Sequence, residues 1–384
     1  MRVIRDLAAR LAAEPRRANS ILADFARSHT FPLVHDGRAT FFFWDGDPVD
    51  AIYLLHWVHG LESRQSYVRI ENTHAYCVSV DLPGSGRVEY KLELHRRGQR
   101  QWIRDPHNPR LARDPFGANS VCPMPGYTEP VWAFPESGVR AGRLETFSLS
   151  SAVWGGERDI TVYLPSEYKP HKRYPLLICH DGDDYLKYAG MKTVLDNLIG
   201  RHEMAPTVVA FTSGSAARNE EYGANPKQVA FLVDELLPAL NGRYGLSDDP
   251  RDRALMGASF GGVSTLFTAW SRPGVFSRLL LQSGSFVFTD VGGHGRSELW
   301  DPVVDFVNEL RQDPARVDAR VFMSCGTFES LITFNRAMAP RLRAAGLTVR
   351  FVQSQDGHNW IGWRDRLRDG LSWLLPGYLW MTYE

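Results

Sequence analysis

The feature that most constrains the fold is an alternation of short apolar runs and helix-like segments that begins near residue 141. The apolar runs have the length of strands, and the segments between them carry apolar residues at helical spacing. Strands that alternate with helices form a mainly parallel sheet with helices on both faces. The sequence therefore predicts a doubly wound α/β domain over residues 141–384. The strand-like runs are ITVYLP, YPLLICHDG, PTVVAFT, RALMG, RLLLQSG, ARVFMSCG and VRFVQSQ.

A serine in the stretch RALMGASFGGVSTLF lies between a predicted strand and a predicted helix. Gly257 stands two residues before Ser259 and Gly261 two residues after it. The pattern G-x-S-x-G between a strand and a helix is the nucleophile elbow of α/β-hydrolases. Its turn is so tight that a side chain at either glycine would collide with its surroundings. We therefore predict that Ser259 is a catalytic nucleophile.

A serine nucleophile needs a base that takes its proton, and in α/β-hydrolases the order along the chain is serine, acid, histidine. Two histidines follow Ser259 in the sequence. His294 lies in a loop with no strand immediately before it, whereas His358 follows the strand-like run VRFVQSQ by a few residues. A loop from that strand end can return toward the elbow. We predict His358 as the base.

Three carboxylates between the serine and the end of the chain are candidates for the acid that orients His358. Glu329 comes just after the predicted strand ARVFMSCG, at the strand edge where catalytic groups gather in open α/β sheets. Asp356 is only two residues from His358 and is poorly placed to bond the far ring nitrogen. Asp318 precedes its strand and belongs to the opposite edge. The prediction is Glu329.

An oxyanion hole requires two backbone N–H donors that point at the developing negative charge. The residue after the nucleophile, Phe260, supplies one donor from the start of the helix. The second donor is expected in the turn after an early strand. The stretch LLICHDGDDY offers it at Asp183, which follows Gly182.

The first third of the chain has a different organisation. Residues 35–125 contain aromatic and aliphatic runs separated by turn residues, which predicts an N-terminal Ig-like β-sandwich. Before it, residues 1–34 show helical spacing of apolar residues and predict a helical segment. The Pro- and Gly-rich stretch around residues 105–132 predicts no regular element, and residues 126–140 are expected to form an ordered linker.

The composition excludes several classes of partner. The 44 basic residues balance 44 acidic ones, so net charge gives no reason to expect binding of nucleic acid or membranes. No apolar run is long enough to span a membrane, and the charged N-terminus does not read as a signal peptide. The four cysteines form no CxxC pair, so no metal site is expected. We expect a cytoplasmic protein without a cofactor; the oligomeric state stays open.

Four stretches of the chain together resemble the enterochelin (enterobactin) esterase family of the esterase D-like α/β-hydrolase superfamily. The likeness covers roughly residues 35–375, and the combination of stretches is far more specific than the elbow alone. The four stretches are GASFGGVSTL with FSRLLLQSGSF, RNEEY with FLVDELLPAL, DGHNWIGWRDRL, and DPHNPRLARDPFGANSVCPMPGY.

This resemblance implies a cytoplasmic serine esterase, a carboxylic ester hydrolase that opens catecholate siderophore lactones and thereby releases iron. Ser259, Glu329 and His358 match the triad positions of the family. Arg218 matches an arginine of the family's pocket, although an ion pair with Glu221 is an equally good interpretation. We also expect a set of aromatic side chains to bind the substrate: Phe286, Phe288 and Trp360.

One departure from the family pattern keeps other functions open. After QSGS the family tends to carry consecutive tryptophans, whereas this chain has Phe286, Val287 and Phe288. A feruloyl or acetyl carbohydrate esterase with a similar leader domain is therefore an alternative, as is an acyltransferase with the same triad. An alternative of another class is a carbohydrate-binding protein with an inactive hydrolase domain, against which the intact triad argues.

Overall fold

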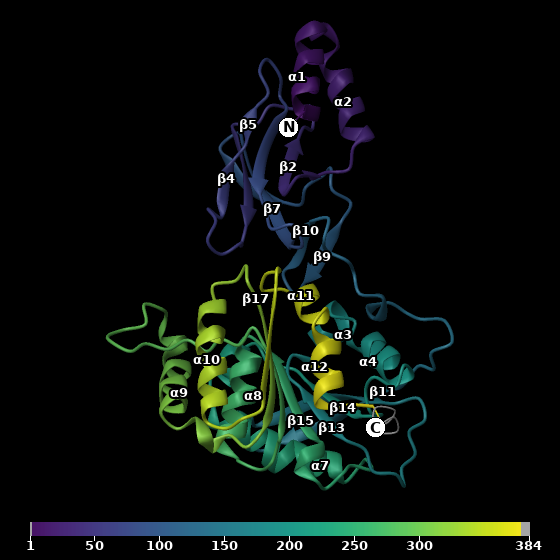
Figure 1. The fold of residues 1–384 in the computed structure, drawn as a ribbon, viewed down its shortest axis with the longest axis vertical. Coiled ribbons are helices and arrows are strands. Elements are labelled where there is room, and N and C mark those ends of the chain that lie inside the picture. The colour runs from purple at the N-terminus through teal and green to yellow at the C-terminus, as the bar shows by residue number, and fades with distance from the viewer. Residues whose placement is uncertain (1, 378–384) are drawn as a thin grey trace. The chain divides into compact units, whose positions relative to one another are not determined.

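The computed structural model describes residues 2–377 and divides the chain into two compact units. The first unit comprises Met1–Thr128 together with two short segments from much later in the chain, Thr327–Glu329 and Gln355–Asn359. The second unit contains the rest of the chain from Glu129 onward. In Figure 1 the N-terminal part is purple to blue, and the later part runs from teal to yellow.

Two helices open the chain where the sequence predicts a helical segment. They are α1 (Arg2–Ala13) and α2 (Ala18–Ser28). Pro15 separates them, because proline lacks the N–H that would continue the first helix and its ring clashes with the preceding turn. Leu7 and Leu22 are buried, in a cluster that also includes Phe42 of the adjoining sheet. Both helices therefore cover part of the first unit's sheets.

The first unit contains two antiparallel sheets. The four-stranded sheet has the order β1-β2-β6-β5, and the other has the order β4-β3-β7-β10-β9 with β8 paired to β7. The strands are β1 (Leu33–His35), β2 (Arg38–Phe43), β3 (Ala51–His56), β4 (Arg64–Ser66), β5 (Val68–Arg69), β6 (Tyr76–Asp81), β7 (Arg87–Arg96), β8 (Gln99–Ile103), β9 (Leu111–Asp114) and β10 (Gly117–Pro123).

One hydrophobic core joins these two sheets. Phe41 of β2 and Val80 of β6 share it with Leu54 of β3 and with Tyr90 and Leu92 of β7. Alternate residues of β7 point into this core, as expected for a strand with one buried face. Antiparallel sheets over a shared core agree with the predicted sandwich, and its Ig-like character stays a prediction.

The expectation that residues 105–132 contain no regular element is wrong. The hairpin of β9 and β10 lies within this stretch and extends the second sheet beyond β7. Its strands are poor in β-branched and aromatic residues, so propensity alone does not predict them. They form because β10 pairs with the long strand β7 from Tyr90 to Arg87, and such pairing outweighs intrinsic preference.

The second unit is built on an eight-stranded mixed sheet of the α/β-hydrolase type. Its order is β11-β12-β14-β13-β15-β16-β17-β18. The pairs β11–β12 and β12–β14 are antiparallel, whereas every pair from β14 to β18 is parallel. The strands are β11 (Arg143–Ser151), β12 (Gly156–Leu164), β13 (Leu176–Cys179), β14 (Val208–Thr212), β15 (Arg253–Ala258), β16 (Arg278–Gln282), β17 (Arg320–Gly326) and β18 (Val349–Ser354).

Helices cover both faces of this sheet (Figure 1). Leu255 and Leu279 face one core with α7 to α10, while Met256 and Leu280 face the other core with α3, α4 and α12. A π-helical turn at Phe231–Leu236 joins α6 to α7. The helices are α3 (Gly182–Tyr188), α4 (Met191–Gly200), α5 (Arg218–Tyr222), α6 (Pro226–Ala230), α7 (Leu237–Asn241), α8 (Phe260–Ser271), α9 (Asp301–Gln312), α10 (Ile332–Ala344), α11 (Trp360–Arg364) and α12 (Leu367–Leu374).

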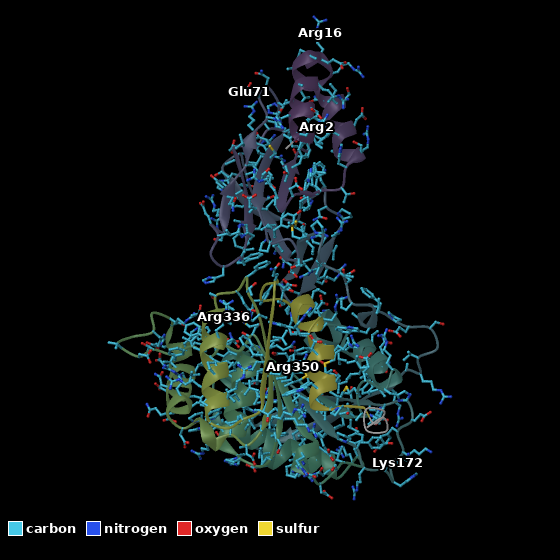
Figure 2. All side chains as sticks on the ribbon, in the orientation of Figure 1. Arg2, Arg16, Glu71, Lys172, Arg336 and Arg350 are labelled. Atoms are coloured by element: carbon cyan, nitrogen blue, oxygen red, sulfur yellow. The ribbon has the colours of Figure 1, made fainter. Side chains whose placement is uncertain are left out.

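Charged side chains stand on the surfaces of both units, as Figure 2 shows for Arg16 and Glu71 in the first and Lys172 and Arg350 in the second. From Glu129 onward, the expected linker lies within the second unit. Trp132 is buried in the second unit's core, and Asn197 of α4 donates hydrogen bonds to the carbonyl oxygens of Trp132 and Phe134 at 2.8 and 2.7 Å. This segment therefore belongs to the second unit.

Candidate active site

Ser259 occupies a one-residue turn between β15 and α8. Its backbone angles are φ 57° and ψ −121°, a combination that residues with a side chain rarely adopt. Strained backbone of this kind persists where the surrounding structure enforces it, and it concentrates at functional sites. The local geometry is that of the predicted elbow.

The two glycines of the elbow differ in how closely an added side chain would meet its surroundings. A Cβ atom on Gly257 would lie 2.4 Å from both the carbonyl carbon and the carbonyl oxygen of Gly261, well inside van der Waals contact. A Cβ atom on Gly261 would lie 3.3 Å from His180 Cβ and from Asp181 Oδ2. The first contact is with backbone that cannot move aside, whereas the second is with side chains.

Substitution of Gly257 by alanine is therefore expected to destabilise the protein. The new methyl group forces β15 and α8 apart, and overpacking of this kind costs about 1–3 kcal/mol. The free energy of unfolding in urea measures the effect. Gly293→Ala is the matched control, because a Cβ atom there has no neighbour within 4 Å. Equal stability of both variants would contradict the steric role of Gly257.

The surroundings of Ser259 include a second serine that the sequence analysis did not identify. Ser259 Oγ lies 3.2 Å from Ser285 Oγ. Two hydrogen bonds fix the backbone of Ser259. Its N–H donates to the Gln282 carbonyl at 2.9 Å, and its carbonyl accepts the N–H of Ser285 at 3.1 Å. Ser285 lies in QSGSF, just after the end of β16. Its position after a central strand is the sequence feature that could have identified it as a site residue.

His358 and Glu329, predicted as base and acid, are hydrogen-bonded to each other. His358 Nδ1 lies 2.6 Å from Glu329 Oε2. The Glu329 side chain is buried, with 5% of its surface exposed, whereas the His358 side chain is 36% exposed. A buried carboxylate on Nδ1 fixes the orientation of the ring and its tautomer.

The strand ends that lead to these three residues lie at one edge of the sheet. Parallel pairing aligns Ala258 with Gln282 and Gln282 with Ser324, and Gly326 aligns with Ser354. The elbow follows β15, the Glu329 loop follows β17, and the His358 loop follows β18. All three segments therefore leave the carboxyl edge of the sheet, where sites of open α/β folds form.

Two of the three alternatives rejected on sequence grounds, His294 and Asp356, have other polar partners. His294 lies in the loop before α9, and its Nε2 atom is 2.8 Å from Oδ1 of Asp301, the first residue of α9. Asp356 accepts hydrogen bonds from Arg87 at 3.2 and 3.3 Å. Asp318 is exposed before β17.

The backbone N–H groups of the two predicted oxyanion donors, Phe260 and Asp183, have different surroundings. Phe260 is the first residue of α8, where backbone N–H groups lie beyond the helix's own hydrogen bonds. The N–H of Asp183 donates to Ser213 Oγ at 3.2 Å. For Asp183 to serve an oxyanion, its N–H must exchange this hydroxyl for the substrate.

Arg218 does not pair with Glu221, so that interpretation of the sequence is wrong. Its Nε and Nη2 atoms donate to the two carboxylate oxygens of Asp181, each at 2.5 Å. Glu221 instead pairs with Arg158 at 2.8 Å. The fold decides this, because Asp181 sits in a left-handed turn (φ 53°) directly before α3, within reach of α5.

His180, in the same HDGDD stretch, is fully buried beneath the elbow. Burial lowers its pKa to about 4, so the ring is neutral at pH 7. Nε2 lies 3.0 Å from Ser264 Oγ, and Nδ1 lies 2.9 Å from the Met256 carbonyl oxygen. These contacts join β13 to β15 and α8, so His180 supports the elbow from below.

The three aromatic residues predicted to bind substrate have different environments. Phe286 is fully buried in the core, packed beneath Gly284, so its predicted role as a substrate contact is a misassignment. Phe288 lies under the Arg311 guanidinium, 3.7 Å from the ring centroid. Trp360 is 9% exposed and packs edge-on against Tyr185, with 5.2 Å between the ring centroids. Of the three, Phe286 is removed from the candidate site.

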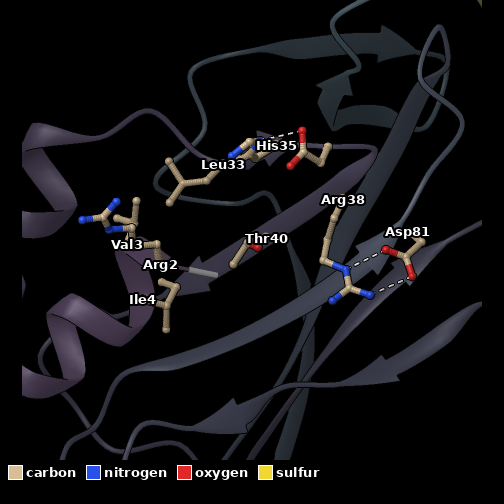
Figure 3. A pocket seen from close by; sticks show the side chains of 9 residues that line it. Arg2, Val3, Ile4, Leu33, His35, Arg38, Thr40 and Asp81 are labelled. Carbon is tan, nitrogen blue, oxygen red and sulfur yellow. Dashed lines mark hydrogen bonds and ion pairs between the residues drawn. The ribbon is translucent and has the colours of Figure 1, made fainter.

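A cavity of about 360 Å³ lies in the first unit, between α1 and the strands β1 and β2 (Figure 3). Val3, Ile4 and Leu33 form one wall. Arg38, bound to Asp81 at 2.6 and 2.8 Å, lies at another. None of the predicted site residues lines it.

Among residues 2–377, no group of three or more His, Cys, Asp or Glu side chains is arranged to hold a metal ion. Within the same residues, none of the helices has the length and apolar character needed to cross a bilayer.

The family model "Putative esterase" matches residues 151–374. The chain is 28% identical over 357 residues to an iron(III) enterobactin esterase of Dickeya dadantii, covering 83% of this chain and 81% of that protein. It is 24% identical over 242 residues to an endo-1,4-beta-xylanase/feruloyl esterase of Xylanibacter ruminicola, covering 59% of this chain and 30% of that protein. A crystal structure of ferric enterobactin esterase from Salmonella typhimurium has a TM-score of 0.77 at 22% identity, covering 92% and 98% of the two chains. That structure shares the fold.

Proposed function

Because the chain belongs to the Esterase family and is an ester hydrolase of the enterobactin esterase type, we propose that Ser259, His358 and Glu329 carry its reaction. The observation that supports this most strongly is the 2.6 Å hydrogen bond between His358 and Glu329. The strained backbone of Ser259 at the elbow adds independent support.

In the proposed reaction, Ser259 Oγ attacks the ester carbonyl carbon while its proton moves to Nε2 of His358. Glu329 accepts the hydrogen bond of Nδ1 and stabilises the imidazolium that forms. The C–O bond to the alcohol then breaks, and His358 returns the proton to the leaving oxygen. Water repeats the sequence on the acyl-enzyme and releases the acid. The N–H groups of Phe260 and Asp183 would stabilise the oxyanion in both halves.

We propose a catecholate siderophore lactone, or a similar aryl ester, as the substrate, with iron as cargo. The relative named as an iron(III) enterobactin esterase aligns over 83% of the chain, whereas the feruloyl esterase aligns over 59%. Arg218, whose side chain is 30% exposed, is the candidate partner for anionic oxygens of the substrate and would exchange its ion pair with Asp181 for them. Trp360, which is 9% exposed, is the candidate aromatic contact.

Substrate preference is expected to follow this proposal. The ratio kcat/KM for linear and cyclic catecholoyl-serine esters should exceed that for feruloyl and acetyl sugars by more than about tenfold, or roughly 1.4 kcal/mol of transition-state binding. Steady-state hydrolysis of the purified chain measures each ratio. A tenfold preference for a sugar ester would overturn the siderophore proposal and leave the esterase proposal standing. Transfer to an added alcohol in place of water would identify an acyltransferase.

A further inference from the structure

The loop that carries Glu329 is anchored in the first unit by the residue before it. Phe328 is 5% exposed and belongs to the hydrophobic core of the two N-terminal sheets. Its carbonyl oxygen accepts the N–H of His59 at 2.6 Å. Gly86 leaves room for the ring, since a Cβ atom there would lie 2.8 Å from Phe328 Cζ. The acid loop is therefore part of the N-terminal core.

The loop that carries His358 is tied to the same unit at its start. The N–H of Arg87 donates to the Gln355 carbonyl at 3.0 Å, and Ser85 Oγ donates to Gln355 Oε1 at 2.6 Å. The next carbonyl, that of Asp356, accepts the N–H of Phe328 at 3.1 Å. These bonds join the histidine loop to the acid loop as well as to β7.

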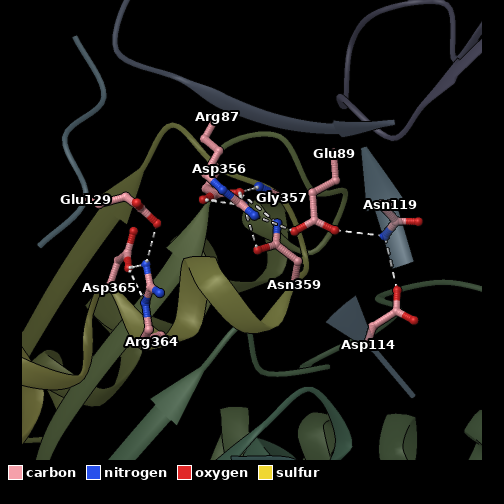
Figure 4. A network of polar contacts seen from close by, with 10 residues as sticks. All are labelled: Arg87, Glu89, Asp114, Asn119, Glu129, Asp356, Gly357, Asn359, Arg364 and Asp365. Atoms are coloured by element: carbon pink, nitrogen blue, oxygen red, sulfur yellow. Dashed lines mark hydrogen bonds and ion pairs between the residues drawn. The ribbon is translucent and has the colours of Figure 1, made fainter. Parts of the chain in front are cut away.

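The Asp356 carboxylate binds Gly357 and Asn359, the two neighbours of His358 in the chain (Figure 4). Its Oδ1 atom accepts the N–H of Gly357 at 2.7 Å and the side-chain amide of Asn359 at 2.7 Å. Arg87 Nη1 donates to both carboxylate oxygens, at 3.2 and 3.3 Å, and to Asn359 Oδ1 at 3.1 Å. The residues before and after the histidine are thus held by one ion pair.

Arg87 is a buried charge whose contacts are directed at this loop. Its side chain is 3% exposed, and its Nη2 atom donates to Glu89 at 2.7 Å. Burial acts to lower its pKa, but Asp356 and Glu89 outweigh burial and hold the pKa above the usual arginine value. Removal of one partner of a buried pair leaves the other charge uncompensated. Because separating Arg87 from Asp356 would leave a buried charge without its partner, the ion pair holds the histidine loop against β7.

We propose that Arg87 is a positioning residue for catalysis: through Asp356 and Asn359 it holds His358 in register with Glu329. The proposal rests on the proposed function, because it assumes that the His358–Glu329 pair acts in the reaction. It assigns part of the catalytic geometry to an N-terminal β-strand that lies more than 200 residues before either loop in the chain. Groups that orient a metal-binding histidine typically account for 10- to 100-fold of metal affinity or activity, and we expect an effect of the same order for His358.

The test compares Arg87→Met with Arg64→Met in the full chain. Arg64 pairs with Glu93 of the same strand at 2.8 and 3.1 Å, so its loss also breaks an ion pair of the first unit without touching either loop. We expect Arg87→Met to lower kcat by about 10- to 100-fold with KM nearly unchanged. Arg64→Met should retain the wild-type kcat. Thermal unfolding of both variants reports any general loss of stability.

A spectroscopic readout separates positioning from stability. The proton shared by His358 Nδ1 and Glu329 should give a downfield ¹H resonance, which is assigned by its absence in His358→Gln. Arg87→Met should shift or broaden this resonance, and Arg64→Met should leave it in place. In a Glu329→Gln background, Arg87→Met should reduce kcat little further, because the pair through which Arg87 acts is already broken.

If Arg87→Met does not fold, Arg87→Lys provides the test. Lysine keeps the positive charge but lacks the planar set of guanidinium donors. This variant should fold and still show a reduced kcat. Wild-type kcat and an unchanged resonance in either folded variant would overturn the proposal. Full activity of Ser259→Ala would instead overturn the proposed function, so the two failures are distinguishable.

Discussion

Replacement of Ser259 by alanine is expected to reduce kcat/KM on the order of 10⁴- to 10⁶-fold, the loss typical of a missing triad member. Ser259 stands in the elbow at φ 57°, and its hydroxyl contacts that of Ser285 at 3.2 Å. Alanine can occupy the same turn, so the free energy of unfolding should change little. Steady-state hydrolysis of an aryl ester measures the loss, and urea denaturation measures the stability.

Ser271→Ala, at the last residue of α8, is the matched control and should retain full activity. A fluorophosphonate probe should label the wild type and Ser271→Ala but not Ser259→Ala. A Ser259→Ala variant that keeps a tenth of the wild-type rate would exclude the nucleophile assignment. An unlabelled wild-type protein would favour a binding protein with an inactive hydrolase domain.

Replacement of Glu329 by glutamine is expected to lower kcat by about 10⁴-fold, with a smaller effect on KM. The amide keeps the size of the side chain but cannot stabilise the imidazolium of His358, whose Nδ1 lies 2.6 Å from the carboxylate. The loss should not exceed that of Ser259→Ala, since Glu329 acts through His358. Separate determination of kcat and KM checks this prediction.

Asp318→Asn is the control for removal of a carboxylate, because Asp318 is exposed at the opposite end of β17. It should behave as the wild type. If Glu329→Gln were close to wild type, the hydrogen bond to His358 would have no catalytic role and the acid would have to be sought elsewhere.

Much of the second unit could be predicted from local pattern. The apolar runs before Ser259, Glu329 and His358 are the strands β15, β17 and β18, and their parallel order places the strand ends at one edge. The spacing of apolar residues and the residue types that favour turns can be recognised within short stretches of one sequence, so these elements are predictable without the structure. The same local patterns did not predict β9 and β10. These strands form because β10 pairs with β7 and β9 pairs with β10, not because of their own β propensity.

The choice between neighbouring polar partners depended on contacts between distant segments. Asp181 binds Arg218 across 37 residues, whereas the sequence offered the nearer Glu221. The N–H of Asp183 is held by Ser213, and Phe286 is turned into the core. Each outcome depends on how loops at the sheet edge fold over one another, and spacing along the chain does not encode that.

By itself, the sequence determined the α/β alternation, the glycine-framed serine and the short list of histidines and carboxylates that could serve it. Only the tertiary structure decided that Glu329 bonds to His358 while Asp356 pairs with Arg87, 269 residues away. The physical reason is that a hydrogen bond of 2.6 Å depends on the relative placement of two loops to within a fraction of an ångström. That placement arises from strand register and from packing of Phe328 in a core built by the N-terminal sheets.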